Sequence, residues 1–164
     1  MKKLFWILAV LALLVSLGLL PFSATDVAEL LPAQTVIITR SGDRYTVDIG
    51  AGVRAVGKTV KAALEALKQE VSGTVFFGTA EQVIVHESAA DAVEQVVTEP
   101  AFRPAAAVLL TDDDRPDAEA ITDYLSGRPD TLSIGEARGL LLQGQALSLP
   151  LLTPTDGGYR IVES

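Results

Sequence analysis

The stretch EQVIVHE, residues 81–87, decides how this chain folds. Its centre, Val83, Ile84 and Val85, is an unbroken apolar run. The run is too short for a helix and too continuous for a strand with one solvated face. We therefore predict a central strand of a β-sheet, and the segments on either side of it supply the rest of the fold.

The segments that follow this strand alternate helical and extended signals. Ser88, with Asp91 three residues on, predicts the cap of a helix. AAAVLLT, residues 105–111, predicts a second central strand. This strand runs into the acidic turn DDDRPD, after which Ile121 and its apolar neighbours predict a short helix.

Both ends of the domain carry hairpin signals. TVIITR at residues 35–40 and the alternating YTVDI at residues 45–49 flank a turn, and an amphipathic helix is expected over residues 60–71. Near the carboxyl end, Ser133 and Glu136 have the spacing of a capping box that begins another helix. LSLPLL and GYRIV then flank the turn signal TPTDGG and predict a terminal hairpin.

These elements follow the order ββαβαβααββ. Strand pairs mixed with helices predict a single α+β domain, in which one mixed β-sheet has helices packed on a face of it. We expect this domain over residues 35–164, after a linker at residues 25–34. The chain has no cysteine, so the domain must be stabilised by its core rather than by disulfides.

The amino-terminal residues predict on which side of the membrane the rest of the chain lies. Lys2 and Lys3 precede an apolar run, residues 4–20, that contains no charge and ends at Pro21. This pattern predicts a hydrophobic helix within residues 1–24, which is either a signal peptide or an uncleaved transmembrane anchor. Because flanking lysines stay on the inner side, the rest of the chain is expected on the extracytoplasmic side of the membrane.

The charge of the chain excludes some partners. The formal net charge is −8, and the exported part is more acidic still because both amino-terminal lysines stay inside. Nucleic acid and anionic lipid headgroups are therefore poor partners for it. We expect contact with the membrane through the amino-terminal helix alone.

One short stretch raises a nucleotide-binding alternative. In GVRAVGKT, Gly52, Gly57, Lys58 and Thr59 have the spacing of a P-loop. The strand before it alternates, however, whereas such a loop normally follows a strand that is buried on both faces. Little nucleoside triphosphate is expected outside the membrane. Our preferred interpretation is that Gly57 or Thr59 opens the next helix and that Lys58 is solvated.

Other side chains that could carry chemistry lack partners in the sequence. His86 is the only histidine, so we expect a hydrogen-bonded structural role rather than zinc ligation or base catalysis. Asp112, Asp113, Asp114 and Asp117 could gather calcium, but their spacing lacks the glycine and the distal glutamate of a dedicated loop. We expect Asp114 to cap the next helix instead.

The remaining candidates are serines and aromatic residues. No histidine and acid are arranged in the sequence to activate Ser72, Ser88 or Ser133. We therefore predict no enzyme, no metal site and no cofactor. Phe76 and Phe77 are interpreted as core and turn residues, with contact to a protein partner as the alternative.

A longer run resembles a known family. GKTVKAALEALKQEVSGTVFFGTAEQVIVHES is similar to the most recognisable segment of the Ger(x)C family, the C subunits of spore germinant receptors. In that family Gly-Lys-Thr begins a helix, and an aromatic-Phe-Gly element and a strand of Val and Ile follow. These features correspond here to residues 57–59, 76–78 and 83–85. The likeness covers residues 35–111, and GGYRIVES is similar to the strand that closes the family's amino-terminal domain.

The chain also departs from this family's pattern. Members are lipoproteins whose signal ends in a cysteine, which this chain lacks, and Thr79 stands where the family usually has His or Asn. We expect the apolar helix to replace the lipid as anchor. The chain stops where the family's further domains begin, which suggests an isolated amino-terminal domain or a shortened gene product.

The resemblance implies a role in sporulation and spore germination. The chain would be a non-enzymatic, membrane-tethered component that contacts the integral membrane subunits of a germinant receptor at the spore inner membrane. Two alternatives stay open on the residues alone. One is the P-loop nucleotide-binding protein, and the other is an unrelated exported adaptor or sensor domain.

Overall fold

The computed structural model describes residues 30–71, 73–126, 128 and 131–162. The expected amino-terminal helix and residues 25–29 of the expected linker lie outside these residues. Among the described residues, no helix is long and apolar enough to cross a membrane.

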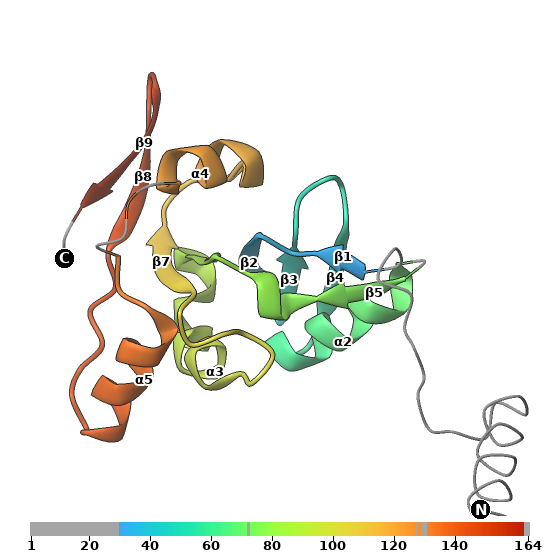
Figure 1. Cartoon of the computed structure of the whole chain (residues 1–164), viewed down its shortest axis with the longest axis horizontal. Helices are drawn as coiled ribbons and strands as arrows, with labels where there is room; N and C mark the ends of the chain where they lie inside the picture. Colours follow the sequence, from blue (N-terminus) through green and yellow to red (C-terminus); the bar gives the residue numbers. More distant parts are fainter. Residues whose placement is uncertain (1–29, 72, 127, 129–130, 163–164) are drawn as a thin grey trace, which may run out of the picture.

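A mixed seven-stranded sheet forms the centre of the domain, in the spatial order β4-β3-β2-β6-β7-β8-β9 (Figure 1). Strands β2, β6, β7 and β8 are parallel neighbours, and β3, β4 and β9 extend the sheet with antiparallel pairs. The bounds are β2 Thr35–Ser41, β3 Arg44–Asp48, β4 Arg54–Gly57, β6 Gln82–His86, β7 Ala107–Thr111, β8 Leu151–Thr155 and β9 Gly158–Val162. The α+β class and the mixed sheet that the sequence predicts are confirmed.

Strand β6 occupies the middle of this sheet, as the opening stretch predicts. Ile84 pairs with Ile37 on β2 and with Leu109 on β7. Val83 and Val85 point to the opposite face, and the side chains of all three β6 residues are fully buried. A strand with apolar residues on both faces needs cover on both faces.

The helices supply that cover from both sides. Helices α2 Val60–Glu70, α3 Val93–Thr98 and α5 Ile134–Leu142 lie on the face that carries Val83 and Val85. Helix α4 Ala118–Leu125 packs on the other face against Ile84 (Figure 1). The expectation of helices on one face only is therefore wrong, because Ile121 and Leu125 of α4 cover the second face.

Three short strands escaped the sequence-based prediction. Strands β1 Leu30–Pro32 and β5 Thr74–Phe76 form a separate parallel ribbon. β1 falls within the expected linker at residues 25–34, so the folded domain begins before residue 35. The third is β4, which pairs with β3 inside the stretch expected to be a loop.

Of the helix caps expected from the sequence, Ser133 and Thr59 are confirmed, whereas Asp114 and Ser88 are not. Ser133 and Glu136 form the expected capping box at the start of α5. Asp114 does not cap α4, because Asp117 accepts hydrogen bonds from the first backbone N–H groups of that helix. Ser88 does not cap its helix either. The 3₁₀ helix Glu87–Ala92 precedes α3, and the side chain of His86 accepts the hydrogen bond from Ser88 N.

Candidate functional site

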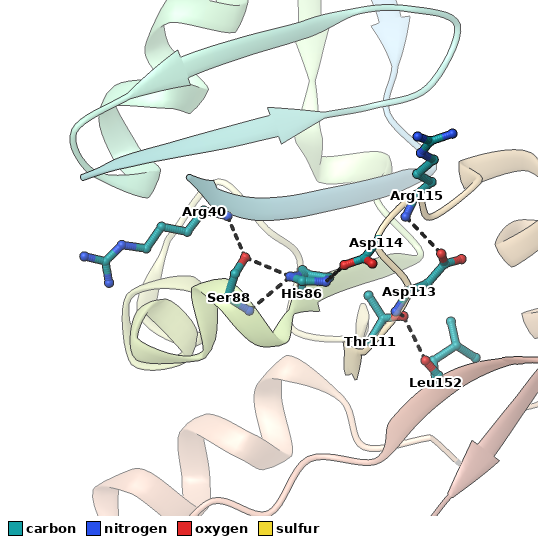
Figure 2. Close-up of polar contacts among 8 residues, drawn as sticks. All are labelled: Arg40, His86, Ser88, Thr111, Asp113, Asp114, Arg115 and Leu152. Carbon is teal, nitrogen blue, oxygen red and sulfur yellow. Dashed lines mark hydrogen bonds and ion pairs between the residues drawn. The ribbon is translucent and has the colours of Figure 1, made fainter. Parts of the chain in front are cut away.

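The carboxyl ends of the neighbouring strands β2 and β6 lie where the direction of the chain connections reverses in the sheet. The chain leaves β2 toward β3 and leaves β6 toward β7, in opposite directions across the sheet. In open sheets with parallel strands, ligands commonly bind in the crevice at such a point. Here the side chains of His86 and Ser88 meet the backbone N–H of Arg40 at the end of β2, while the Arg40 side chain points away (Figure 2).

Hydrogen bonds fix these three residues to one another. Arg40 N donates to Ser88 Oγ at 3.0 Å, and Ser88 N donates to His86 Nδ1 at 3.0 Å. Because Nδ1 accepts a backbone N–H, the proton of the neutral imidazole lies on Nε2. The Ser88 hydroxyl, 2.8 Å from the same Nδ1, can then donate to it. These bonds join the end of β2 to the residues that follow β6.

An acid stands on the other side of the imidazole. Asp114 Oδ1 lies 3.9 Å from His86 Nε2, and its side chain is 99% exposed (Figure 2). The fold therefore brings a histidine and an acid close to Ser88, which the sequence did not indicate. In a serine-hydrolase relay, however, the hydroxyl contacts Nε2 and a buried acid contacts Nδ1. Here the two ring nitrogens have exchanged partners and the acid is in solvent, so the cluster is better suited to fastening strands than to nucleophilic attack.

A second cluster fastens the same edge on the opposite face of the sheet. Asp91 Oδ2 accepts hydrogen bonds from Arg40 Nη1 at 2.6 Å and from Tyr45 Oη at 2.7 Å. The hydrogen bond from Tyr45, with the charge of Arg40, lowers the pKa of Asp91. The same hydrogen bond, with burial, raises the pKa of Tyr45. Arg40 and Asp91 therefore join β2, β3 and the 3₁₀ helix without leaving a free charge for a ligand.

Hydrogen bonds with neighbouring residues hold the acidic turn after β7. Asp113 N donates to Thr111 Oγ1, Arg115 N donates to Asp113 Oδ1, and the Thr111 hydroxyl donates to Leu152 O (Figure 2). Tyr159 Oη donates to Asp113 Oδ2 at 2.8 Å. Among the described residues, no group of three or more His, Asp or Glu side chains is arranged to hold a metal ion.

The residues of the P-loop alternative are spread over three kinds of structure. Gly52, with φ +77, lies in the turn between β3 and β4, and Gly57 ends β4. Thr59 is the cap of α2, with its hydroxyl accepting from Ala62 N at 3.1 Å. Lys58 is exposed between them. A phosphate-binding loop needs consecutive backbone N–H groups around one centre, whereas a strand here takes up the middle of the motif.

Gly57 has a different, structural reason to be glycine. A Cβ atom at this position would lie 2.3 Å from Ala63 N and 2.7 Å from Ala62 C. Side chains cannot approach backbone atoms so closely, so the end of β4 can touch α2 only through a glycine. Together with the cap by Thr59, this contact accounts for Gly-Lys-Thr at the start of a helix without a nucleotide.

The two phenylalanines of Phe-Phe-Gly have opposite environments. Phe77 is 2% exposed and makes an edge-on contact with Phe102, with ring centroids 6.0 Å apart. Phe76 is 49% exposed at the end of β5. Its ring lies over Gly78, where a Cβ atom would be 2.8 Å from ring atom Cζ. Of the two residues proposed for partner contact, only Phe76 is therefore accessible.

Two shallow cavities lie elsewhere on the described surface. The larger, about 380 Å³, is lined by residues of the β3–β4 turn and of α4, among them Gly50, Glu119 and Asp123. The smaller, about 220 Å³, includes Gln82 and Arg128. Neither contains His86, Lys58 or Phe76, and the smaller is lined by Ser133 and Glu136 of the capping box.

Comparisons with protein-family models, with curated proteins and with solved structures found no match to this chain.

Proposed function

We propose that this chain is a membrane-tethered, extracytoplasmic binding protein of spore germination, similar to the C subunit of a germinant receptor and acting by contact with integral membrane subunits. The proposal combines the Ger(x)C resemblance with one structural observation. Phe76 is held half-exposed over Gly78, although it is a large apolar side chain whose neighbour Phe77 is in the core. Exposed, rigidly held aromatic residues are typical anchors of protein interfaces.

The position of Phe76 supports this proposal. β5, which carries Phe76, pairs with β1, where the described chain begins. Residues 21–29, between the apolar run and β1, span at most roughly 30 Å even when fully extended. A tether in the membrane would therefore keep the β1–β5 ribbon close to the bilayer, where integral subunits are within reach.

The proposed contact can be tested by site-specific photo-crosslinking in sporulating cells. A photoreactive amino acid is placed at position 76 of the full chain, and the matched control is placed at Leu142, which is 84% exposed but lies on α5. We expect crosslinks to integral germinant receptor subunits from position 76 and none from position 142. A Phe76→Ala variant should lose co-purification with those subunits and slow germination.

Two results would contradict the proposal. One is equal crosslinking from both positions, which indicates random collision. The other is normal germination of a deletion strain together with no receptor subunit among the crosslinked products. Crosslinks from position 76 to an unrelated membrane protein would instead support the exported-adaptor alternative.

A further inference from the structure

Strand β4 forms one edge of the seven-stranded sheet. It pairs with β3 on one side, and within the described residues no strand pairs with its other side. Its side chains alternate, with Ala55 2% exposed over α2 and Val56 46% exposed on the opposite face. An unpaired edge presents free backbone N–H and C=O groups to any other extended chain.

Basic side chains surround this edge. Arg54 begins β4 and Lys58 follows its last residue, while Arg44 begins the neighbouring strand at the same end of the hairpin as Lys58. Lys61 lies in the first turn of α2, a turn that contains no acidic residue. All four cations are exposed, and none of them takes part in the ion pairs found among the described residues. Asp48 of β3 is the register partner of Arg54, and its carboxylate accepts a hydrogen bond from Gly50 N.

This arrangement, Arg44, Arg54, Val56, Lys58 and Lys61, is called the basic edge below. It stands out in a chain whose net charge is −8. Arg44 and Lys58 lie at the same end of the β3–β4 hairpin and repel each other, and Lys61 lies at the positive end of the α2 helix dipole. An opposite charge supplied from outside would relieve both costs.

Cations on an edge strand also have a protective role, because they deter pairing between edges of the same kind. That role decides which occupant fits. A second copy of β4 would bring its own cations against these, so the edge rejects self-association. An extended segment with carboxylates meets no such repulsion, and an apolar side chain on it could cover Val56.

We propose that the basic edge binds an extended acidic segment of a partner protein, which adds to β4 as a further strand. Main-chain hydrogen bonds along residues 54–57 supply affinity, the four cations select carboxylates, and Val56 contacts the one apolar residue between them. This surface is distinct from Phe76, which lies on the separate β1–β5 ribbon. The inference therefore stands or falls independently of the proposed function.

The test uses the full chain in a non-ionic detergent and a fluorescein-labelled seven-residue peptide of alternating Glu and Val. We expect saturable binding by fluorescence anisotropy. Raising the salt from about 50 to about 300 mM should weaken it roughly tenfold, because exposed ion pairs are screened. Amide hydrogen exchange should slow at residues 54–57 when the peptide is present.

Matched variants separate edge pairing from general charge attraction. Arg54→Glu/Lys58→Glu should weaken binding at least about tenfold and gain binding of the corresponding Lys-Val peptide. Arg160→Glu, on β9 at the other edge of the sheet, should leave binding unchanged. Val56→Lys adds a positive charge and should still weaken binding, because it removes the apolar contact of Val56. This variant tests the proposal if circular dichroism shows that the double variant does not fold.

Three results would overturn the proposal. They are saturable binding that Arg160→Glu weakens as much as the double variant does, slowed exchange at β9 instead of β4, and the lack of any binding at millimolar peptide.

Discussion

The hydroxyl of Tyr159 donates a 2.8 Å hydrogen bond to Asp113 Oδ2 and accepts one from Asp117 N at 3.2 Å. Tyr159 lies on β9, and the two aspartates lie in the acidic turn between β7 and α4. One phenol therefore joins the last hairpin to the turn that introduces α4. Burial, and to a lesser degree the neighbouring carboxylates, raises the pKa of Tyr159 to about 12.

This shift predicts a loss of stability in alkali. An unfolded tyrosine ionises near pH 10, whereas folded Tyr159 keeps its proton until about pH 12. The contribution of this group is therefore fully present below pH 10 and is lost as the pH rises from 10 to 12. We expect a fall of about 1 kcal/mol in the free energy of unfolding, less than the shift alone implies because the ring is partly solvated.

Urea denaturation at pH 9 and pH 11.5 measures this fall. Tyr159→Phe removes the ionisable group, so its stability should depend less steeply on pH over this range. Part of the slope should remain, because Tyr45 also has a raised pKa. Identical slopes for the two proteins would show that Tyr159 is not the group that links stability to pH.

A pair of glycines tests the contact between β4 and α2. Gly57→Ala places a methyl group 2.3 Å from Ala63 N, so we expect a loss of about 2–4 kcal/mol. Gly139 lies inside α5, where a Cβ atom would meet nothing within 4 Å. Gly139→Ala should therefore raise stability by about 0.5–1 kcal/mol. Thermal unfolding of the two variants against the wild type provides the measurement, and equal stability of Gly57→Ala would refute the close approach.

The central strand shows what sequence pattern can predict. Val83, Ile84 and Val85 had no alternative to burial on both faces, and the same reasoning predicted β7. The turn signal predicted the terminal hairpin, although residues 153–155 of that signal belong to β8. The apolar run of β6 should also have predicted cover on both faces, since such a run alone implies it. The helix through Ile121 is the element that covers the second face, but its sequence pattern does not indicate which face of the sheet it packs on.

The missed features depend on contacts between distant segments. β4 is four residues long and contains two exposed side chains, so its period-two pattern is too short to recognise. Likewise, His86 and Ser88 are two residues apart, and only the fold places Arg40 N within 3.0 Å of the Ser88 hydroxyl. A lone histidine at the end of a strand offered no signal for a cap, because Ser and Asp are the usual capping residues.

Thr59 separates the capping role from the nucleotide-binding alternative. Thr59→Ala should cost about 1 kcal/mol of stability, because it removes the acceptor for Ala62 N. Thr59→Asp should keep this stability, since Asp is a good cap and its charge favours the helix amino end. Lys58→Ala should be nearly neutral. Calorimetric titration with Mg-ATP adds the functional readout: tight binding that Lys58→Ala abolishes would reinstate the P-loop.

Substitutions of His86 distinguish a structural role from a catalytic role for the cluster at the end of β6. If His86 acts as a cap, His86→Ala should cost about 1 kcal/mol, because Ser88 N loses its acceptor. His86→Asn should recover most of that loss, since a carboxamide oxygen can accept from the amide two residues on. Asp114→Asn should change nothing measurable, because its carboxylate is 99% exposed.

A fluorophosphonate probe supplies the catalytic readout on the same variants. Such probes form a covalent bond only with a serine whose hydroxyl is activated by a neighbouring base. We expect no labelling of Ser88, because its oxygen already accepts from Arg40 N and the imidazole nitrogen beside it already accepts from Ser88 N. Labelling of Ser88 that disappears in His86→Asn, although that variant is as stable as the wild type, would show that the cluster is a nucleophile and base rather than a fastener.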